Sequence, residues 1–532
     1  ATLYDELTGA RRTALHRRVG ESVEALHAGA LDDYLPALAH HFRAAADSER
    51  SVEYAARAGQ RALGQLAFHD AVTYFSQALE RAGDDRHLEL LLGLGEAQQR
   101  AGDPAHREIL LRAGELALGQ GDSGALARAA IANNRWFHSF SGWVDSERVA
   151  VAQAALQAVG DEDPALRARL LAILATELSF GPDHELRRQI STEAVRLARG
   201  CGDAATLGEV MARRWTVLAP SGTVERQEEI DELKRVSDEL DDPMLAFWVA
   251  MWVGYHHVML GDRPAADAGY QEAERLTDVL GQPLCSWSVN FSLSTLSRLA
   301  GALDQAEEHA RRGLELAGGI VDAPHLYGAN LFWVRYDQGR LDEMIDALRR
   351  GAARDRRNPL TLAALGVALC EGGRVDEAGP VFREMAADDF AMLPGNFLWL
   401  YGLTMAAECC SHLDDGRHAR FLSEALAPHG ALVGHAGGGA TGCVDHYIAL
   451  LAASLGRPDD ADARFASAAA VHERLRAPTL LARTRLEWAQ MLRDRSLPGD
   501  AGRAQELLDQ ALSTARRLGL GTIERRATAL LQ

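Results

Sequence analysis

Residues 59–78 read GQRALGQLAFHDAVTYFSQA, and this stretch decides the fold. After the small residue Gly59 come Ala71, Phe75 and Ala78, at spacings of four and three residues that place them on one face of a helix. Small side chains on both sides of a bulky one let two helices approach closely while the large side chain fills the space between them. The pattern predicts a pair of packed helices.

The same pattern returns along the chain. Breaks at Gly261, Gly301, Gly339, Gly373 and Gly456 are followed five residues later by Ala266, Ala306, Met344, Ala378 and Ala461. Possible helix starts recur every 39 or 40 residues, at Asp163-Pro164, Gly202-Asp203, Asp242-Pro243, Gln282-Pro283 and Asp322-Ala323-Pro324. Proline is favoured in the first turn of a helix, and Asp is a good cap before it. We therefore expect successive helix pairs along most of the chain.

These offsets resemble the tetratricopeptide repeat. The copy from Gly59 to Ala78 matches the repeat's small and aromatic positions, and the copy with Gly366, Ala378 and Phe382 matches most of them. The resemblance implies an all-α fold, a right-handed superhelical solenoid of tetratricopeptide-like helix pairs in which contacts are mainly between neighbours.

The predicted organisation has four parts. Residues 1–50 form N-terminal helices that link to a missing upstream module, since the chain starts at Ala1 and looks like a piece of a longer protein. Residues 51–427 are tetratricopeptide-like repeats, and 445–532 are C-terminal repeats with a capping helix. Residues 428–444 are too rich in glycine to propagate a helix and are predicted to be a flexible inter-repeat loop.

Composition excludes several function classes. The net charge is −19 and the pI about 5.5, so the chain has no general basic field for nucleic acid or anionic lipid. Lys234 is the only lysine and lies in a charged helical segment, so a Walker-type phosphate loop is missing. Six scattered cysteines and the lack of a long apolar run favour a cytoplasmic protein without a membrane span.

Two regions carry a wider resemblance. Residues 12–16 (RTALH) and 38–42 (LAHHF), and later 445–447 (DHY) and 450–457 (LLAASLGR), look like the helical arm of large bacterial ATP-dependent regulators of the LuxR type. In that family a signal-transducing ATPase module precedes the repeats and a DNA-binding domain often follows them. The resemblance implies a regulatory arm that acts on its own upstream ATPase module. The Ala, Arg and Gly bias is actinobacterial-like.

The best candidate site is the concave stripe of the superhelix, which faces away from the second helix of each pair. Three consecutive units place aromatic residues there, with one arginine suited to orienting a carboxylate or phosphate. The candidate ligand-binding or partner-binding residues are Trp248, Met251, Tyr255, Phe291, Arg298, Trp333 and Tyr336. Arg135, Trp136, Arg213, Arg214 and Trp215 are possible extensions. The alternative is that these aromatics only fill a tightly wound superhelix.

Metal binding and catalysis receive no support. Adjacent histidines on a helix point about 100° apart, so His40-His41 and His256-His257 cannot each chelate one ion, and His435, Cys443 and His446 lack a metal-ligand spacing. In the glycine-rich loop Ala440 occupies the place of the Walker lysine. We expect no cofactor, no metal and no enzyme activity.

Three hypotheses follow. The first is a sensor arm that binds a small-molecule effector, and the second is a protein-docking or oligomerisation scaffold, possibly a homo-oligomer, without a small ligand. The third is an enzyme built on the solenoid, which requires a closed pocket with convergent histidine and carboxylate groups.

Overall fold

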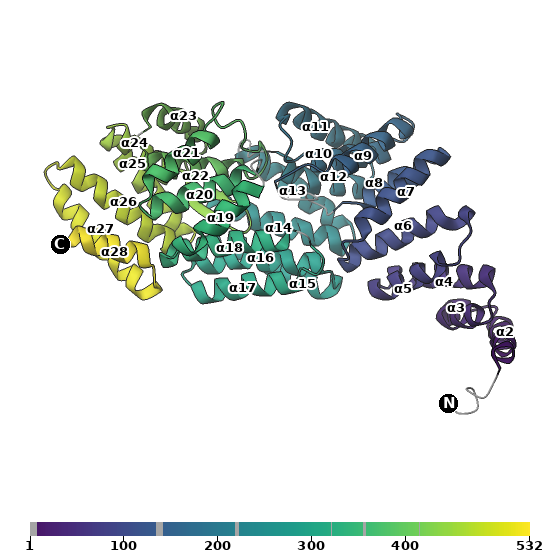
Figure 1. Ribbon diagram of the computed structural model, residues 1–532. Coiled ribbons are helices and arrows are strands. Elements are labelled where there is room, and N and C mark those ends of the chain that lie inside the picture. Colours follow the sequence, from purple (N-terminus) through teal and green to yellow (C-terminus); the bar gives the residue numbers. More distant parts are fainter. Residues whose placement is uncertain (1–7, 135–141, 219–222, 321, 355–357, 414) are drawn as a thin grey trace.

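The computed structural model describes residues 8–134, 142–218, 223–320, 322–354, 358–413 and 415–532. Helices follow one another in a curved array, with α2 at one end and α28 at the other (Figure 1). The predicted all-α helical solenoid is confirmed.

The elements have the following bounds. The first part contains α2 Gly9–Leu26, η1 Leu31–Tyr34, α3 Leu35–Ala44, α4 Ser48–Gly64, α5 Phe68–Leu79, α6 Asp84–Ala101, α7 His106–Gln120 and α8 Ser123–Ala132. The middle contains α9 Ser146–Val159, α10 Pro164–Glu177, α11 His184–Cys201, α12 Ala204–Val217, α13 Thr223–Glu239, α14 Pro243–Leu260, α15 Arg263–Leu280, α16 Pro283–Leu299, α17 Leu303–Leu316, α18 Ala323–Gln338, α19 Asp342–Arg354, α20 Pro359–Glu371 and α21 Val375–Met385. The last part contains α22 Trp399–His412, α23 Gly416–Leu426, η2 Ala427–His429, β1 Val433–His435, β2 Ala440–Cys443, α24 Val444–Ser454, α25 Pro458–Arg474, α26 Pro478–Arg495, α27 Asp500–Leu518 and α28 Gly521–Leu531.

The helix pairs pack as the small-large pattern predicts. A Cβ atom on Gly59 of α4 would lie 2.9 Å from the ring of Phe75 on α5, and one on Gly254 of α14 would lie 2.9 Å from the ring of Tyr270 on α15. Ala71, which precedes Phe75 on the same face, is fully buried. The absence of a side chain at these glycines therefore lets each bulky ring fill the space between two helices.

The predicted helix ends are also confirmed where caps can be seen. The side chain of Asp163 accepts a hydrogen bond from the amide of Leu166 (2.9 Å), and Asp242 caps α14 in the same way. The breaks at Gly261 and Gly301 have φ angles of 72° and 84°, in the left-handed region that glycine adopts without strain.

Contacts are mainly between neighbouring units, as predicted, but a few hydrogen bonds join units that are far apart in the sequence. Arg187 Nη2 donates to the carbonyl of Gly395 (2.7 Å), and Asn396 Nδ2 donates to the carbonyl of Ser179 (2.9 Å). Thr479 Oγ1 donates to the carbonyl of Leu299 (3.2 Å). Helices and loops of distant units therefore touch, so the coil is tightly wound.

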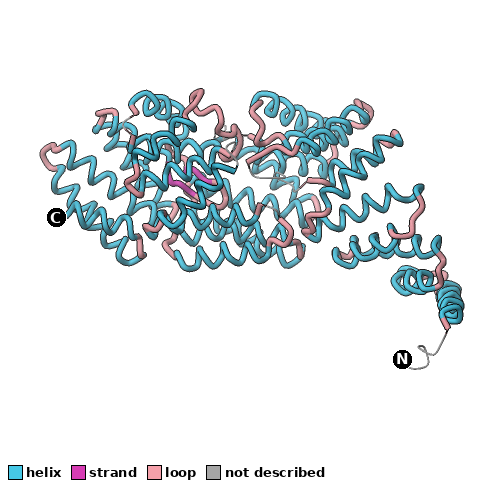
Figure 2. Tube along the Cα trace, viewed as in Figure 1, coloured by secondary structure: helices cyan, strands magenta, loops and turns pink. Residues whose placement is uncertain are grey.

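Within the described residues, strand structure is limited to β1 and β2, which lie among the helices rather than at an edge (Figure 2). The two strands pair antiparallel, with Val433 opposite Cys443 and Gly434 opposite Gly442. Both strands are buried along their whole length. The segment 428–444 does connect two units, but it contains a buried β-hairpin in place of the predicted flexible loop.

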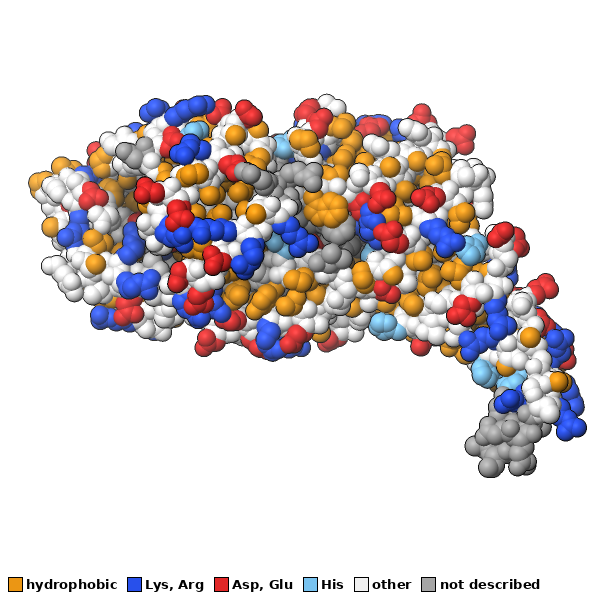
Figure 3. All heavy atoms as spheres, viewed as in Figure 1, with side chains coloured by type: hydrophobic (Ala, Val, Ile, Leu, Met, Phe, Trp, Pro, Cys, Tyr) orange, Lys and Arg blue, Asp and Glu red, His pale blue; other side chains and the backbone are white. Residues whose placement is uncertain are grey.

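The surface carries charges of both signs. Acidic and basic side chains are interspersed over the face drawn in Figure 3. Among the described helices, we found none that is both long and apolar enough to cross a membrane.

Candidate functional site

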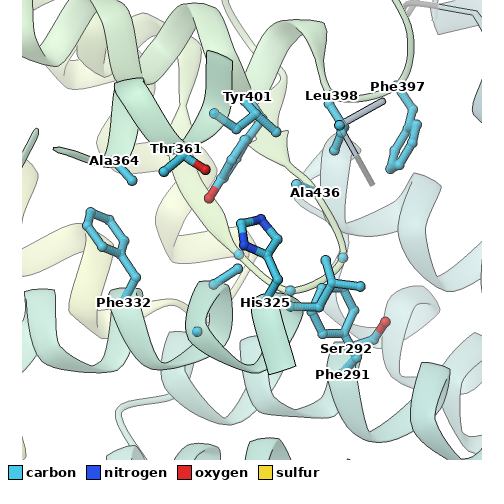
Figure 4. Close-up of a pocket in the computed structure, with 18 of the residues that line it drawn as sticks. Phe291, Ser292, His325, Phe332, Thr361, Ala364, Phe397, Leu398, Tyr401 and Ala436 are labelled. Carbon is cyan, nitrogen blue, oxygen red and sulfur yellow. The ribbon is translucent and has the colours of Figure 1, made fainter. Parts of the chain in front are cut away.

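A cavity of about 340 Å³ lies on the concave face, where the inner helices of successive units converge. We call it the inner cavity. Figure 4 shows side chains from these helices pointing toward it. Its wall includes Trp248, Met251, Trp252 and Tyr255 of α14, Phe291 and Ser292 of α16, His325, Ala329 and Phe332 around α18, Thr361 and Ala364 of α20, Phe397, Leu398 and Tyr401 at the start of α22, and Ala436–Gly439.

The local sequence explains why these helices offer aromatic rings. Helix α14 is apolar on nearly all sides, because it packs against other helices outward and faces the cavity inward. Trp248, Met251 and Tyr255 follow a spacing of three and four residues along its inner face. The rings of Trp248 and Trp252 stack with centroids 5.5 Å apart, which fixes the shape of this wall.

The hairpin, residues 433–443, closes one side of the inner cavity. At its tip the amide of Ala436 donates to the carbonyl of Gly439 (2.9 Å), and Gly437 has a φ of 72°. A Cβ atom on Gly438 would lie 2.0 Å from the ring of Phe291. The glycines that ruled out a helix are therefore the residues that let a backbone turn fit against an aromatic wall.

The concave stripe binds the hairpin through its backbone carbonyls. Tyr255 donates to His435, and Thr295 Oγ1 donates to Gly437 (2.7 Å). The carbonyl of Gly438 accepts from Asn330 Nδ2 (2.9 Å). Arg298 Nη2 donates to the carbonyl of Ala440. These bonds satisfy backbone groups that would otherwise be buried without a partner.

Arg298 has a structural role here, which corrects its predicted role in binding an anionic ligand. Its side chain is 2% exposed and pairs with Asp337 at 3.1 Å, in addition to its bond to the hairpin. Burial raises the pKa of the Asp337 carboxyl, although Arg298 opposes that shift. Two of the three guanidinium nitrogens, Nη1 and Nη2, therefore bond groups of the chain itself.

Trp333 and Tyr336 lie behind the hairpin rather than in the cavity wall. Trp333 Nε1 donates to the hydroxyl of Tyr401 (2.6 Å), and Tyr336 donates to Glu408 (2.6 Å). Glu408 also pairs with the buried Arg483 at 2.5 Å. This buried polar network holds α18, α22 and α26 together below the hairpin.

The predicted stripe thus divides into two sets. Trp248, Met251, Tyr255 and Phe291 line the inner cavity, and Tyr255 also bonds the hairpin, whereas Arg298, Trp333 and Tyr336 lie outside the lining and support the hairpin. Of the possible extensions, Trp215 stacks on Trp252 with centroids 6.2 Å apart, Arg213 pairs with Glu209 and Arg214 pairs with Glu229. Arg135 and Trp136 lie outside the described residues.

Asn330, Tyr401 and the hairpin tip are parts of the site that the sequence analysis missed. Thr295 and Asn330 are polar residues on otherwise apolar inner faces. Their presence there was the one sequence feature that could have indicated a segment of backbone bound against this face. The hairpin residues gave only a glycine-rich composition, which is common to turns and loops.

The inner cavity is suited to an uncharged ligand. Its described lining residues include no Asp, Glu, Lys or Arg, and His325 supplies the imidazole among them. Burial raises the pKa of the Tyr401 hydroxyl to about 12, so this group stays neutral. Trp252 Nε1 is buried with no hydrogen-bond partner among the described residues, and it offers a donor to a ligand oxygen or nitrogen.

The histidines and the cysteine that the sequence analysis considered and rejected as metal ligands lie among groups of the chain itself. Cys443 Sγ lies 3.2 Å from the carbonyl of Gly430, and His446 Nδ1 lies 3.0 Å from Thr484 Oγ1. Burial lowers the pKa of His435 to about 3. His256 Nε2 lies 3.0 Å from Gln227 Oε1.

A second hollow, of about 580 Å³, lies on the concave side of the earlier units, and we call it the charged groove. Its lining contains ion pairs between neighbouring inner helices. Arg128 of α8 pairs with Glu96 of α6 (2.6 Å), and Arg169 of α10 pairs with Glu209 of α12 (2.7 Å).

No family model matches the chain, and the search of curated proteins found no match either. Among solved structures, the chain is similar to a crystal structure of the APC/C hetero-tetramer Cut9-Hcn1, with 14% sequence identity and a TM-score of 0.34. The alignment covers 89% of this chain and 96% of that one.

Proposed function

We propose that this chain is the non-catalytic regulatory arm of a cytoplasmic ATP-dependent transcriptional regulator of the LuxR type. In this proposal the arm binds an uncharged, mostly apolar effector in the inner cavity. It passes the signal to an ATPase module that lies outside this sequence. The proposal is supported by the motifs at 12–16, 38–42 and 445–457, and above all by an aromatic-walled cavity within the coil.

The hairpin connects the inner cavity to the C-terminal repeats, so a change at the cavity can be transmitted to the rest of the arm. An effector in the inner cavity contacts wall residues such as Met251 and, at the same time, the tip at Ala436–Gly439. The second strand continues directly into α24, at the start of the C-terminal repeats. An effector shifts an equilibrium between two conformations of the arm only if it binds one of them more tightly than the other. An effector that contacts both the cavity wall and the hairpin meets this condition when the two conformations place the hairpin differently against the wall.

Thermal-shift screening of an uncharged metabolite library against the whole chain tests this proposal, because a ligand that binds the folded state raises its melting temperature. Ala329→Phe fills the inner cavity and is expected to abolish the shift. Ala470→Phe on the exposed side of α25 is the matched control and should leave the shift unchanged. Hits that survive Ala329→Phe, or a library without hits, would contradict the effector proposal.

The charged groove favours a second candidate, a protein-docking surface. Its Arg and Glu side chains lie on successive inner helices, an arrangement that suits an extended peptide bearing both charges. Crosslinking of the chain within its parent protein, or to a second copy, would locate this contact. Crosslinks confined to the outer helices would exclude the groove as the docking surface.

A further inference from the structure

Three histidines from two helices converge at the N-terminal end of the molecule, far from the inner cavity. His16 of α2 and His41 of α3 bring their Nδ1 atoms to 2.9 Å, and the ring centroid of His40 lies 5.6 Å from that of His16. The candidate ligand nitrogens of the three side chains all lie within 4.8 Å of one another. Histidine side chains reach the surface of this arm in Figure 3.

The third imidazole changes the conclusion drawn from the sequence. His40 and His41 alone cannot chelate one ion, because neighbours on a helix point in different directions. His16 approaches from the adjacent helix and faces both of them. Two ligand nitrogens that each lie about 2.1 Å from a tetrahedral ion are about 3.4 Å apart. Since no two of the three candidate nitrogens are more than 4.8 Å apart, the longest nitrogen–nitrogen distance must shorten by at most about 1.4 Å. His40 is exposed and can rotate to close it.

The donors have the chemistry of a transition-metal site. Three imidazole nitrogens suit Zn²⁺, Co²⁺, Ni²⁺ or Cu²⁺, whereas Mg²⁺ and Ca²⁺ require oxygen ligands.

Helix α2 also has a structural use for such an ion. Of its described residues only Gly20 is buried, so the helix is attached through few apolar contacts. Its polar contacts to α4 are the partly exposed ion pairs of Arg50 with Glu21 (3.3 Å) and Glu24 (3.4 Å), and a hydrogen bond that the hydroxyl of Tyr54 donates to Glu24. Exposed ion pairs contribute little to stability. An ion shared between His16 and α3 would fasten this helix to the first repeat.

We propose that His16, His40 and His41 form a binding site for one divalent transition-metal ion of the Zn²⁺ class, which joins α2 to α3. This site is independent of the effector proposal, because it lies in different helices and uses different side chains.

Competition of the whole chain with a chromophoric chelator for Zn²⁺ tests the proposal. We expect one ion per chain, and an affinity reduced at least about tenfold by His16→Asn or His40→Asn. His69→Asn, at an exposed histidine on α5, is the matched control and should bind as the wild type does. Equal affinities in the wild type and the His40→Asn variant would overturn the proposal.

Two further readouts separate this site from adventitious binding. Hydrogen exchange in α2 should slow when Zn²⁺ is added to the wild type, and should not respond in His16→Asn. The Co²⁺-loaded chain should show d–d absorption without a thiolate charge-transfer band. A thiolate band, which would place the ion at a cysteine such as Cys201, or α2 exchange that ignores the metal, would also overturn the proposal.

Discussion

The inner faces of two regions differ although their helices pack by the same rule. In α14–α22 the inner face is aromatic, encloses the inner cavity and is covered by the hairpin. In α6–α12 it carries arginine and glutamate and forms the open charged groove. In both regions glycines receive a neighbouring bulky side chain, Leu110 at Gly95 and Tyr270 at Gly254. Small residues between paired helices therefore determine the architecture. The residues of the inner stripe determine which kind of ligand or segment each region can bind.

The largest effect is expected where the aromatic region depends on a buried charge. Arg298→Met leaves Asp337 buried without its partner and removes the bond to the hairpin, so we expect a loss of about 3–5 kcal/mol in the free energy of unfolding. Urea denaturation measures this loss. Arg298→Met combined with Asp337→Leu should recover part of it. A single variant within about 1 kcal/mol of the wild type would show that the pair does not hold the hairpin.

Acid should weaken the aromatic region. Burial lowers the pKa of His435 and of His472 from 6.5 to about 3, and His472 Nε2 accepts the amide of Cys443 (2.8 Å). Between pH 6.5 and about 3 the folded chain therefore binds fewer protons than the unfolded chain. The free energy of unfolding is highest above pH 6.5 and decreases as the pH is lowered through this range. We expect a loss of about 2 kcal/mol for each histidine between pH 6.5 and 5.

Urea midpoints at pH 7 and pH 5 check this expectation. The variant His472→Gln should lose less stability than the wild type between the two values, because it lacks one of the titrating groups. Identical midpoints at both pH values in the wild type would contradict the prediction.

A smaller effect is expected at the hairpin tip. Gly438→Ala places a methyl group against the ring of Phe291 and should cost about 1–3 kcal/mol by overpacking. Phe291→Ala in the same chain should relieve the clash, so the two changes should not be additive. Gly119→Ala is the control, since a Cβ there meets nothing within 4 Å, and it should be neutral or slightly stabilising. Equal stability of Gly438→Ala and wild type would place the tip away from Phe291.

The smallest effect is expected in the charged groove. Arg128→Gln removes partly exposed ion pairs to Glu96 and Glu89, and we expect less than about 1 kcal/mol. Thermal denaturation measures this change. A loss comparable to that of Arg298→Met would mean that the groove is as tightly held as the aromatic region, and the contrast between the two regions would disappear.

The sequence predicts the architecture because its signals are local. Asp242 lies next to the helix that it caps, and Gly254 and Tyr270 are neighbours within one helix pair. The positions of Trp248 and Tyr255 on the inner face also follow from helical periodicity alone. Each of these predictions uses residues that are close in the chain.

The use of the inner face could not be predicted, because it depends on a distant segment. Thr295 meets its carbonyl partner 142 residues later, and Asn330 meets its partner 108 residues later. A glycine-rich composition does not indicate where a turn will dock. The cluster around His16 was missed for the same reason, since its members belong to different helices.

The position of the hairpin in the chain has a consequence for biosynthesis. The ribosome completes α14, α16 and α18 before it synthesises residues 433–443. The hydrogen-bond acceptor of the Tyr255 hydroxyl lies 180 residues downstream and is therefore absent while these helices are made. Until then the polar groups of this wall are hydrated and its rings are open to chaperones. Such long-range closure is slow, and we expect the aromatic region to mature only after translation has passed residue 443.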